Sequence, residues 1–205
     1  MASSRTLRPR REVRPASTGS RRRGKVLEDA ILQATWAELK EAGYAGLTMD
    51  GVASRAHTSK PVIYRRWRSR ANLVLAAMRN RFGSIASDVP DTGTLRGDVL
   101  QLLGRMTQRV RQIPVEVRRG LVAVAPALER EGHPVFELMP GAMASILRHA
   151  QERGEIPKGK IPARVMRVPV DLTRHEIILT QGVVPDSVLE EIVDETFLPL
   201  VRGRF

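Results

Sequence analysis

Cysteine is absent from this chain of 205 residues. The absence excludes a disulfide framework, a thiol nucleophile and a thiolate metal site. Apolar runs are short as well. None approaches the roughly 20 residues of a membrane span, and the basic N-terminus lacks the apolar segment of a signal peptide. Hydrophobic residues nevertheless make up 42% of the chain, enough for a substantial core. We therefore expect a soluble, cytoplasmic protein with no membrane partner.

The motifs of common enzyme classes are also absent. The sequence contains no glycine-rich phosphate loop, no Gly-x-Ser-x-Gly and no His-Glu-x-x-His. Its four histidines are scattered, and the pair His133 and Glu137, four residues apart, offers too few ligands for a metal. We predict that the protein is not an enzyme and that it uses no cofactor and no metal.

Acidic residues are scarce in one part of the chain only. Residues 1–25 contain nine Arg or Lys and one acid, and residues 26–81 contain nine and five. Residues 82–205 contain sixteen of each sign, so the first 81 residues account for the whole net charge of +12. A basic end on a neutral body is typical of a protein that meets a polyanion with one end. Double-stranded DNA is the expected partner.

Residues 1–24 are almost without apolar side chains and end in an Arg triplet, which predicts a disordered arm. Such an arm can follow phosphates or enter the minor groove. The alternative is a solvated tail without a specific role.

Two short helical patterns lie back to back between Leu47 and Trp67. Thr48 is a favourable N-cap for the first, and Ser59, followed by Pro61, is one for the second. The first pattern has its apolar residues at helical spacing, at Met49, Val52, Ala53 and Ala56. The second directs Val62, Ile63 and Trp67 inward. Two helices joined by a tight turn, the second one basic, predict a helix-turn-helix.

The outer face of the second helix has the residue types that bind DNA. Lys60 and Tyr64 are four residues apart and therefore share one side of the helix. Side chains that point into a groove read base edges, whereas hydroxyls and Arg hold phosphates. We predict that Lys60, Pro61 and Tyr64 face the groove. The remaining members of the predicted DNA-binding set are Thr48, Ser59, Arg65, Arg66 and Arg70.

Residues 30–73 resemble the N-terminal domain of the TetR/AcrR family of bacterial transcriptional repressors. The matching residues keep their order and spacing: Ala30, Ile31, Ala34, Leu39, Gly43, Tyr44, Leu47, Thr48, Met49, Val52, Ala53, Ala56, Ser59, Lys60, Ile63, Tyr64, Arg65, Arg66, Trp67 and Leu73. Three positions depart from the family pattern. His57 stands where the family usually has Gly, Thr58 where it has an aliphatic residue, and Arg70 where it has Lys. A turn residue with φ > 0 suits Gly best, although His is tolerated there.

The rest of the chain shows helical periodicity and no sustained strand alternation, which predicts an all-α fold of about nine helices. We expect a three-helix DNA-binding domain over residues 25–86, whose first helix spans 25–42 and stops at Gly43. A break rich in Pro, Asp and Gly at 88–93 separates it from a larger helical regulatory and dimerisation domain over 94–205.

Two apolar helical stretches close the chain, at 162–180 and 185–201, and their short connection predicts an antiparallel pair. The resemblance implies that this pair forms a four-helix bundle with its copy in a homodimer. The alternative is that the pair only completes the monomer core. The predicted interface residues are Leu172, Ile178, Leu189, Ile192, Val193 and Phe197.

The resemblance also implies a small-molecule effector that binds in the body. Methionine adapts to apolar ligands, although methionine at helical spacing lies more often in a core. The candidate pocket residues are Met106, Phe136, Met139, Met143 and His175.

The leading functional hypothesis is a homodimeric, nucleoid-associated bacterial repressor that a small ligand releases from a palindromic operator. One alternative is a sequence-tolerant architectural protein that grips DNA with its basic arm. Its neutral body of more than a hundred residues argues against that role. Another alternative, a helical interaction protein with an incidental basic tail, leaves the Thr48–Trp67 pattern unexplained.

Overall fold

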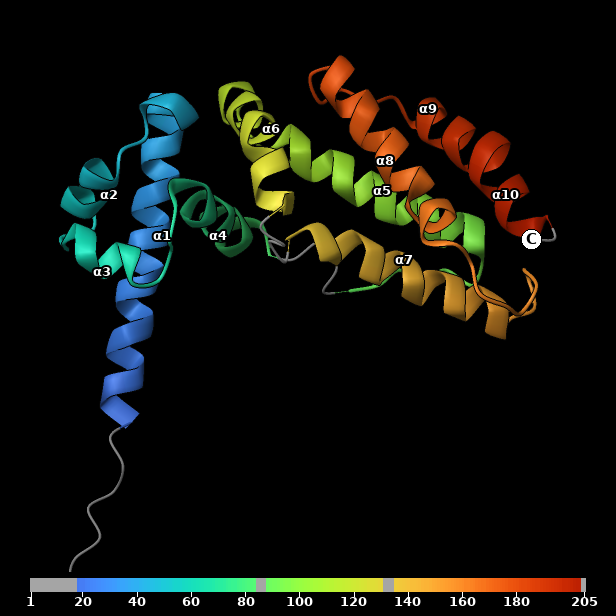
Figure 1. Ribbon diagram of the computed structural model, residues 1–205, viewed down its shortest axis with the longest axis horizontal. Coiled ribbons are helices and arrows are strands. Elements are labelled where there is room, and N and C mark those ends of the chain that lie inside the picture. Colours follow the sequence, from blue (N-terminus) through green and yellow to red (C-terminus); the bar gives the residue numbers. More distant parts are fainter. Residues whose placement is uncertain (1–17, 84–87, 131–134, 204–205) are drawn as a thin grey trace, which may run out of the picture.

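The structure, a computed structural model, describes residues 18–83, 88–130 and 135–203, except for the side chains of 18–23 and 135–138. The described residues form helices and no strand, which confirms the predicted all-α class. Figure 1 shows α1 to α4 grouped at one end and the remaining helices at the other.

The N-terminal group contains α1 (Thr18–Gly46), α2 (Met49–Arg55), α3 (Lys60–Tyr64) and α4 (Arg70–Phe82). The predicted stop at Gly43 is present, because this residue leaves helical geometry with φ 67° and ψ −177°. The start of α1 differs from the prediction. Residues 18–24, expected to belong to a disordered arm, are helical, and residues 1–17 lie outside the described part of the chain. Arg and Lys are good helix formers, so a basic segment can extend a helix that is anchored further along.

The body contains α5 (Leu95–Arg111), α6 (Val115–Arg130), α7 (Val135–Glu152), α8 (Ala163–Leu179) and a last helix of three contiguous parts. These parts are α9 (Asp186–Glu191), the π-helical η1 (Ile192–Phe197) and α10 (Leu198–Arg202). Counting the last helix once gives nine helices among the described residues. A short connection makes α8 and the last helix neighbours, as predicted (Figure 1).

The π-helical segment has a local cause. Pro199 has no N–H, and in an α-helix its ring would clash with the carbonyl of the residue four positions earlier. The turn before it widens, and the N–H of Leu198 bonds to the carbonyl of Val193. The single wide turn lets the helix continue through the proline.

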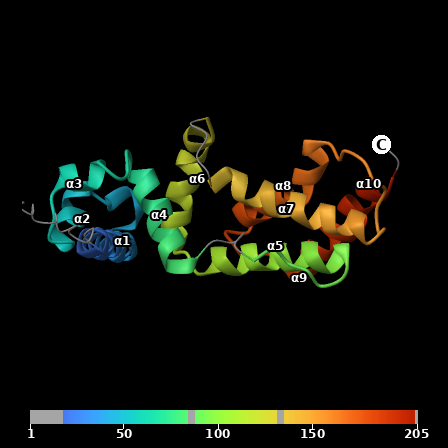
Figure 2. The ribbon, with the colours of Figure 1, turned by 90° about the horizontal axis from the view of Figure 1, so that it is seen from below.

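Two apolar cores hold the fold together. The first core lies among α1 to α4 and includes Ile31, Leu39, Tyr44, Leu47, Val52, Ile63, Trp67, Leu73 and Val74. The body core includes Leu95, Val99, Leu102, Leu103, Met106, Met143, Ile146, Val193 and Phe197. One helix crosses the predicted boundary between them. Val117, at the start of α6, and Ile113, in the connection just before it, are buried in the first core although they follow residue 94. Figure 2 shows α6 lying between α4 and the rest of the body.

Candidate nucleic-acid interface

The entrance to α2 is fixed by a side-chain cap. Thr48 has extended geometry, and its hydroxyl accepts a hydrogen bond of 3.0 Å from the N–H of Gly51. The cap defines where α2 begins. The Thr48 side chain remains exposed, so the same oxygen is accessible from outside.

The turn between α2 and α3 closes on its own backbone. The N–H of His57 bonds to the carbonyl of Ser54 at 3.1 Å, and the N–H of Thr58 bonds to that of Ala53 at 2.9 Å. Together these bonds form a Schellman motif, whose central residue adopts the left-handed conformation. His57 occupies that position with φ 50°, where the resemblance leads one to expect Gly.

Helix α3 is short and anchored on one side. The inward residues are Ile63, which is fully buried, and Trp67, just beyond the helix. On the outer side, Lys60 and Pro61 are exposed, and Tyr64 keeps 47% of its surface exposed. Ser59 has N-cap geometry, but its hydroxyl caps none of the described N–H groups. The predicted groove residues therefore share one open face.

Lys60 is not free on this face. Its ammonium nitrogen lies 2.6 Å from a carboxylate oxygen of Asp50, in the first turn of α2. The hydrogen bond that Lys60 donates to the Asp50 carboxylate raises the pKa of Lys60 above its ordinary value. Both groups are largely exposed, so the pair is worth little to stability. It holds the Lys60 ammonium against the first turn of α2.

The predicted phosphate-binding arginines differ in their surroundings. Arg65 is exposed, whereas Arg66 is half-buried, and its Nη1 has no hydrogen-bond partner among the described residues. Arg70 turns toward the protein. Its Nη1 donates to the carbonyl of Leu47 at 3.2 Å, and its guanidinium stacks 4.6 Å from the ring centre of Tyr44. Arg70 thus ties α4 to the end of α1, and its contact with a DNA phosphate stays a prediction.

Sequence reasoning missed a clamp that orients α2. Arg55 forms ion pairs with Glu38 and Glu41 on α1, and the hydrogen bonds that it donates to Glu41 raise the pKa of Arg55. Gly51 leaves room for the Glu38 carboxylate beside α2, because a Cβ at this position would overlap it. The partners are 14 and 17 residues apart, a separation at which no local pattern signals contact.

Comparison with known proteins bears on both halves of the chain. A model of the bacterial regulatory proteins of the tetR family matches residues 31–77, and a model of the tetracyclin repressor-like C-terminal domain matches residues 89–196. The chain belongs to the TetR family. It is thus a DNA-binding transcriptional regulator, as predicted, and α2 and α3 are its helix-turn-helix.

Individual relatives agree with this assignment. An uncharacterized HTH-type transcriptional regulator of Mycobacterium tuberculosis, Rv1556, is 36% identical over 84% of this chain and 86% of its own length. The DNA-binding transcriptional repressor TetR of Mycobacteroides abscessus is 30% identical over 88% of this chain and 96% of its own length. The crystal structure of the TetR family transcription regulator SCO0332 has a similar fold, with a TM-score of 0.64 and 23% identity, and the match covers 83% of this chain and 96% of that one.

In the body of this TetR-family regulator, the four predicted effector-pocket residues whose side chains are described have different surroundings. Met106 and Met139 are buried in the body core, and His175 is exposed on α8. The Phe136 side chain lies outside the described residues. Met143 lines a small cavity of about 10 Å³ between α7 and α8, with Pro140, Met166, Arg167, Val170, Asp171 and Arg174. Methionines at helical spacing serve here mainly as core residues.

Most of the predicted dimer-interface residues also lie in the core of the monomer. Leu189, Ile192, Val193 and Phe197 are buried in the monomer's own body core, so a partner subunit cannot reach them. Their assignment to an interface is wrong. Leu172 and Ile178, on α8, are exposed.

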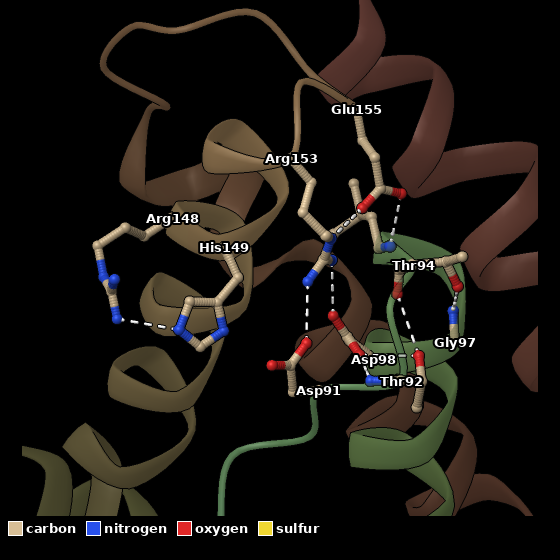
Figure 3. A network of polar contacts seen from close by, with 10 residues as sticks. Asp91, Thr92, Thr94, Gly97, Asp98, Arg148, His149, Arg153 and Glu155 are labelled. Atoms are coloured by element: carbon tan, nitrogen blue, oxygen red, sulfur yellow. Dashed lines mark hydrogen bonds and ion pairs between the residues drawn. The ribbon is translucent and has the colours of Figure 1, made fainter.

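A polar network joins the start of α5 to the end of α7 (Figure 3). Asp98, which is fully buried, accepts hydrogen bonds from the hydroxyl of Thr92 at 2.8 Å and from Arg153 at 2.9 Å. Arg153 also pairs with Glu155, whose hydrogen bond raises the pKa of the arginine. Glu155 in turn accepts from the N–H of Leu95 at 2.7 Å. Arg153 is shared by the carboxylates of Asp91, Asp98 and Glu155, and these contacts tie the start of α5 to the end of α7. We therefore assign the network a structural role.

Within residues 18–83, 88–130 and 135–203, no helix has the length and apolar character needed to cross a membrane. Nor do three or more His, Asp or Glu side chains of those ranges gather as a metal site would require.

Proposed function

We propose that the protein is a homodimeric repressor whose two α3 helices read the half-sites of a palindromic operator, and that a small-molecule effector releases it. The observation that carries the proposal is the open face of α3. Lys60, Pro61 and Tyr64 project from a helix whose other side is fixed by Ile63 and Trp67. A short rigid helix with such a face suits the major groove.

The groove chemistry follows from this arrangement. We infer that Tyr64 contacts base edges with its ring and hydroxyl, and that Lys60 exchanges Asp50 for a DNA acceptor. Ser59, Thr48, Arg65 and Arg66 would then hold phosphates on either side of α3. Most hydrogen bonds in such complexes go to phosphates and set the register, while the few base contacts set the sequence.

One α3 helix reads too few base pairs to define a site, which makes a two-fold dimer the expected form. Support comes from exposed apolar residues on α8, on the connection that follows it and on the last helix. They are Leu172, Ile178, Leu179, Val183 and Leu200. Exposed apolar patches of this kind are typical of protein interfaces.

The dimer surface is tested by one pair of matched variants. Ile178 on α8 and Val122 on α6 are both 48% exposed. We expect Ile178→Glu to shift the protein toward monomer in analytical ultracentrifugation, because a charge would be buried at the interface. Val122→Glu, with the same change in chemistry, should remain dimeric. A fully dimeric Ile178→Glu variant would rule out this face.

Effector release would act through α6. This helix packs Val117 into the first core, and a Cβ on its Gly120 would lie 2.3 Å from the Cβ of Tyr44 on α1. Arg109 of α5 adds a hydrogen bond of 2.7 Å to the carbonyl of Gly83, at the end of α4. A ligand that favours one arrangement of the body would therefore move the DNA-binding end by population shift. The small cavity beside Met143 must widen to hold an effector, since ligand pockets usually enclose some hundreds of Å³.

The operator proposal is tested by selecting genomic DNA fragments on the purified protein at about 0.15 M salt, where non-specific binding is weak. We expect a few fragments that share a palindrome, and we expect the variant Lys60→Ala/Tyr64→Ala to lose them. Recovery from all parts of the genome, unchanged by these substitutions and abolished by deletion of residues 2–20, would instead establish the architectural alternative.

A further inference from the structure

His57 lies in the turn between α2 and α3 with a left-handed backbone, φ 50°. Its side chain is exposed, and its ring forms no hydrogen bond with any described residue. A histidine in this position therefore combines a backbone penalty with a side chain that does nothing for the monomer. A residue kept in a sparsely populated conformation at a functional surface invites a functional explanation.

The geometry of the turn does not require a histidine side chain. The N–H groups of His57 and Thr58 are already bonded to the carbonyls of Ser54 and Ala53. Glycine would make the same two bonds without the steric cost that a Cβ meets at positive φ. Because the backbone donors are occupied, the ring nitrogens are the groups that His57 can offer to another molecule.

The position of the ring indicates which molecule this is. His57 precedes Ser59 and Lys60, which are exposed and open the DNA-reading helix. The hydroxyl of Ser59 is not used as a cap for any described N–H group. Residues 57 to 60 thus form a continuous polar edge where α3 would enter the groove. Phosphate oxygens only accept hydrogen bonds, and an imidazole carries at least one N–H donor in every protonation state.

We propose that His57 is a DNA-contacting residue that donates a ring N–H to a backbone phosphate beside the bases read by α3. The inference rests on the proposed reading of DNA by α3. The imidazole adds affinity and fixes the register of the turn on the duplex, and it reads no base.

The test compares His57→Gly with wild type in operator affinity at about 0.15 M salt and in thermal unfolding. We expect the glycine variant to bind about three- to tenfold more weakly, the loss of one hydrogen bond. Its unfolding midpoint should rise or stay unchanged, because the strain is relieved. Weaker binding by a protein of equal or greater stability cannot be attributed to misfolding. Unchanged or tighter binding would overturn the proposal, and so would a lower unfolding midpoint.

Two controls make the outcome specific. Gln181 has φ 54° in the connection after α8, so Gln181→Gly tests strain relief away from α3 and should also raise or preserve the unfolding midpoint. A fall in its midpoint would remove the strain argument on which the inference stands. Operators with single base-pair changes form the second control. If His57→Gly lowers the affinity for all of these operators by the same factor, the result supports a phosphate contact. If the loss of affinity depends on the identity of one base pair, the result contradicts it.

Tyr64→Ala, measured alongside, separates this inference from the proposed function. If Tyr64→Ala weakens operator binding and His57→Gly does not, only the assignment of His57 fails. If neither variant differs from wild type, the reading of DNA by α3 fails as well.

Discussion

The α2–α3 pair and the pair formed by α8 and the last helix are both amphipathic, and both were predicted from sequence, but with different success. In the first, the inward residues Ile63 and Trp67 are buried and the outward residue Tyr64 is exposed, as expected. In the second, four of the six predicted interface residues are buried in the monomer. A five-residue helix has room for one apolar side. Longer helices have apolar residues on several sides, and periodicity does not say which side meets a partner.

The largest expected effect concerns the core beneath the DNA-reading end. Tyr44 is buried between α1, α6 and the guanidinium of Arg70. We expect Tyr44→Ala to lower the free energy of unfolding by about 3–5 kcal/mol, because it empties a large buried site. Urea unfolding measures the change. A loss below about 1 kcal/mol would mean that this side chain does not hold α6 on α1.

A smaller decrease in the free energy of unfolding is expected from a substitution in the body. Asp98→Ala removes the buried carboxylate that accepts from Thr92 and Arg153, and should cost about 3 kcal/mol of stability. The variant Asp98→Asn keeps an acceptor for Thr92, so it should lose less. Urea unfolding of both variants ranks them. Equal losses would show that the neutral acceptor kept by asparagine contributes nothing and that the charge on Asp98 accounts for the whole effect.

Tyr64→Ala makes the same substitution as Tyr44→Ala, but at an exposed tyrosine of the DNA-reading helix instead of a buried one. We expect specific operator binding to weaken by roughly 1–3 kcal/mol, with the urea midpoint unchanged. Fluorescence anisotropy with a labelled operator gives the affinity. Wild-type affinity in a folded variant would reject Tyr64 as a groove contact.

The smallest effect concerns an exposed pair between α5 and the last helix. The hydrogen bond from Arg96, 2.8 Å away, lowers the pKa of Asp194 below its ordinary value of 3.8. A carboxyl whose pKa is lower in the folded state stabilises the fold above the unfolded-state pKa, and this contribution disappears as the pH falls through the folded-state value.

Asp194→Asn should therefore lower the thermal midpoint slightly at neutral pH and match wild type at strongly acidic pH. Glu195→Gln is the control, since it changes the same charge on a neighbouring residue for which the described part of the chain provides no ion pair. A deficit of Asp194→Asn that persists in acid would contradict the assigned role of the pair.

Much of the DNA-binding end was predictable because its signals are local. The Thr48 cap, the stop at Gly43 and the turn at His57 each depend on residues within a few positions. The Arg55 clamp and the inward turn of Arg70 were not predictable, because their partners lie 14 to 25 residues away. The start of α1 was misplaced, since basic composition alone does not separate an arm from a helix.

The sequence by itself determined the helical class, the order of the helices, the basic end and the residues on the open face of α3. These properties follow from periodicity, capping and charge, which act over one or two helical turns. Only the tertiary structure decided that α6 joins the first core, that the methionines fill the body and that Phe197 faces inward. Such choices depend on which apolar faces meet, and that is settled by packing between segments far apart in the chain.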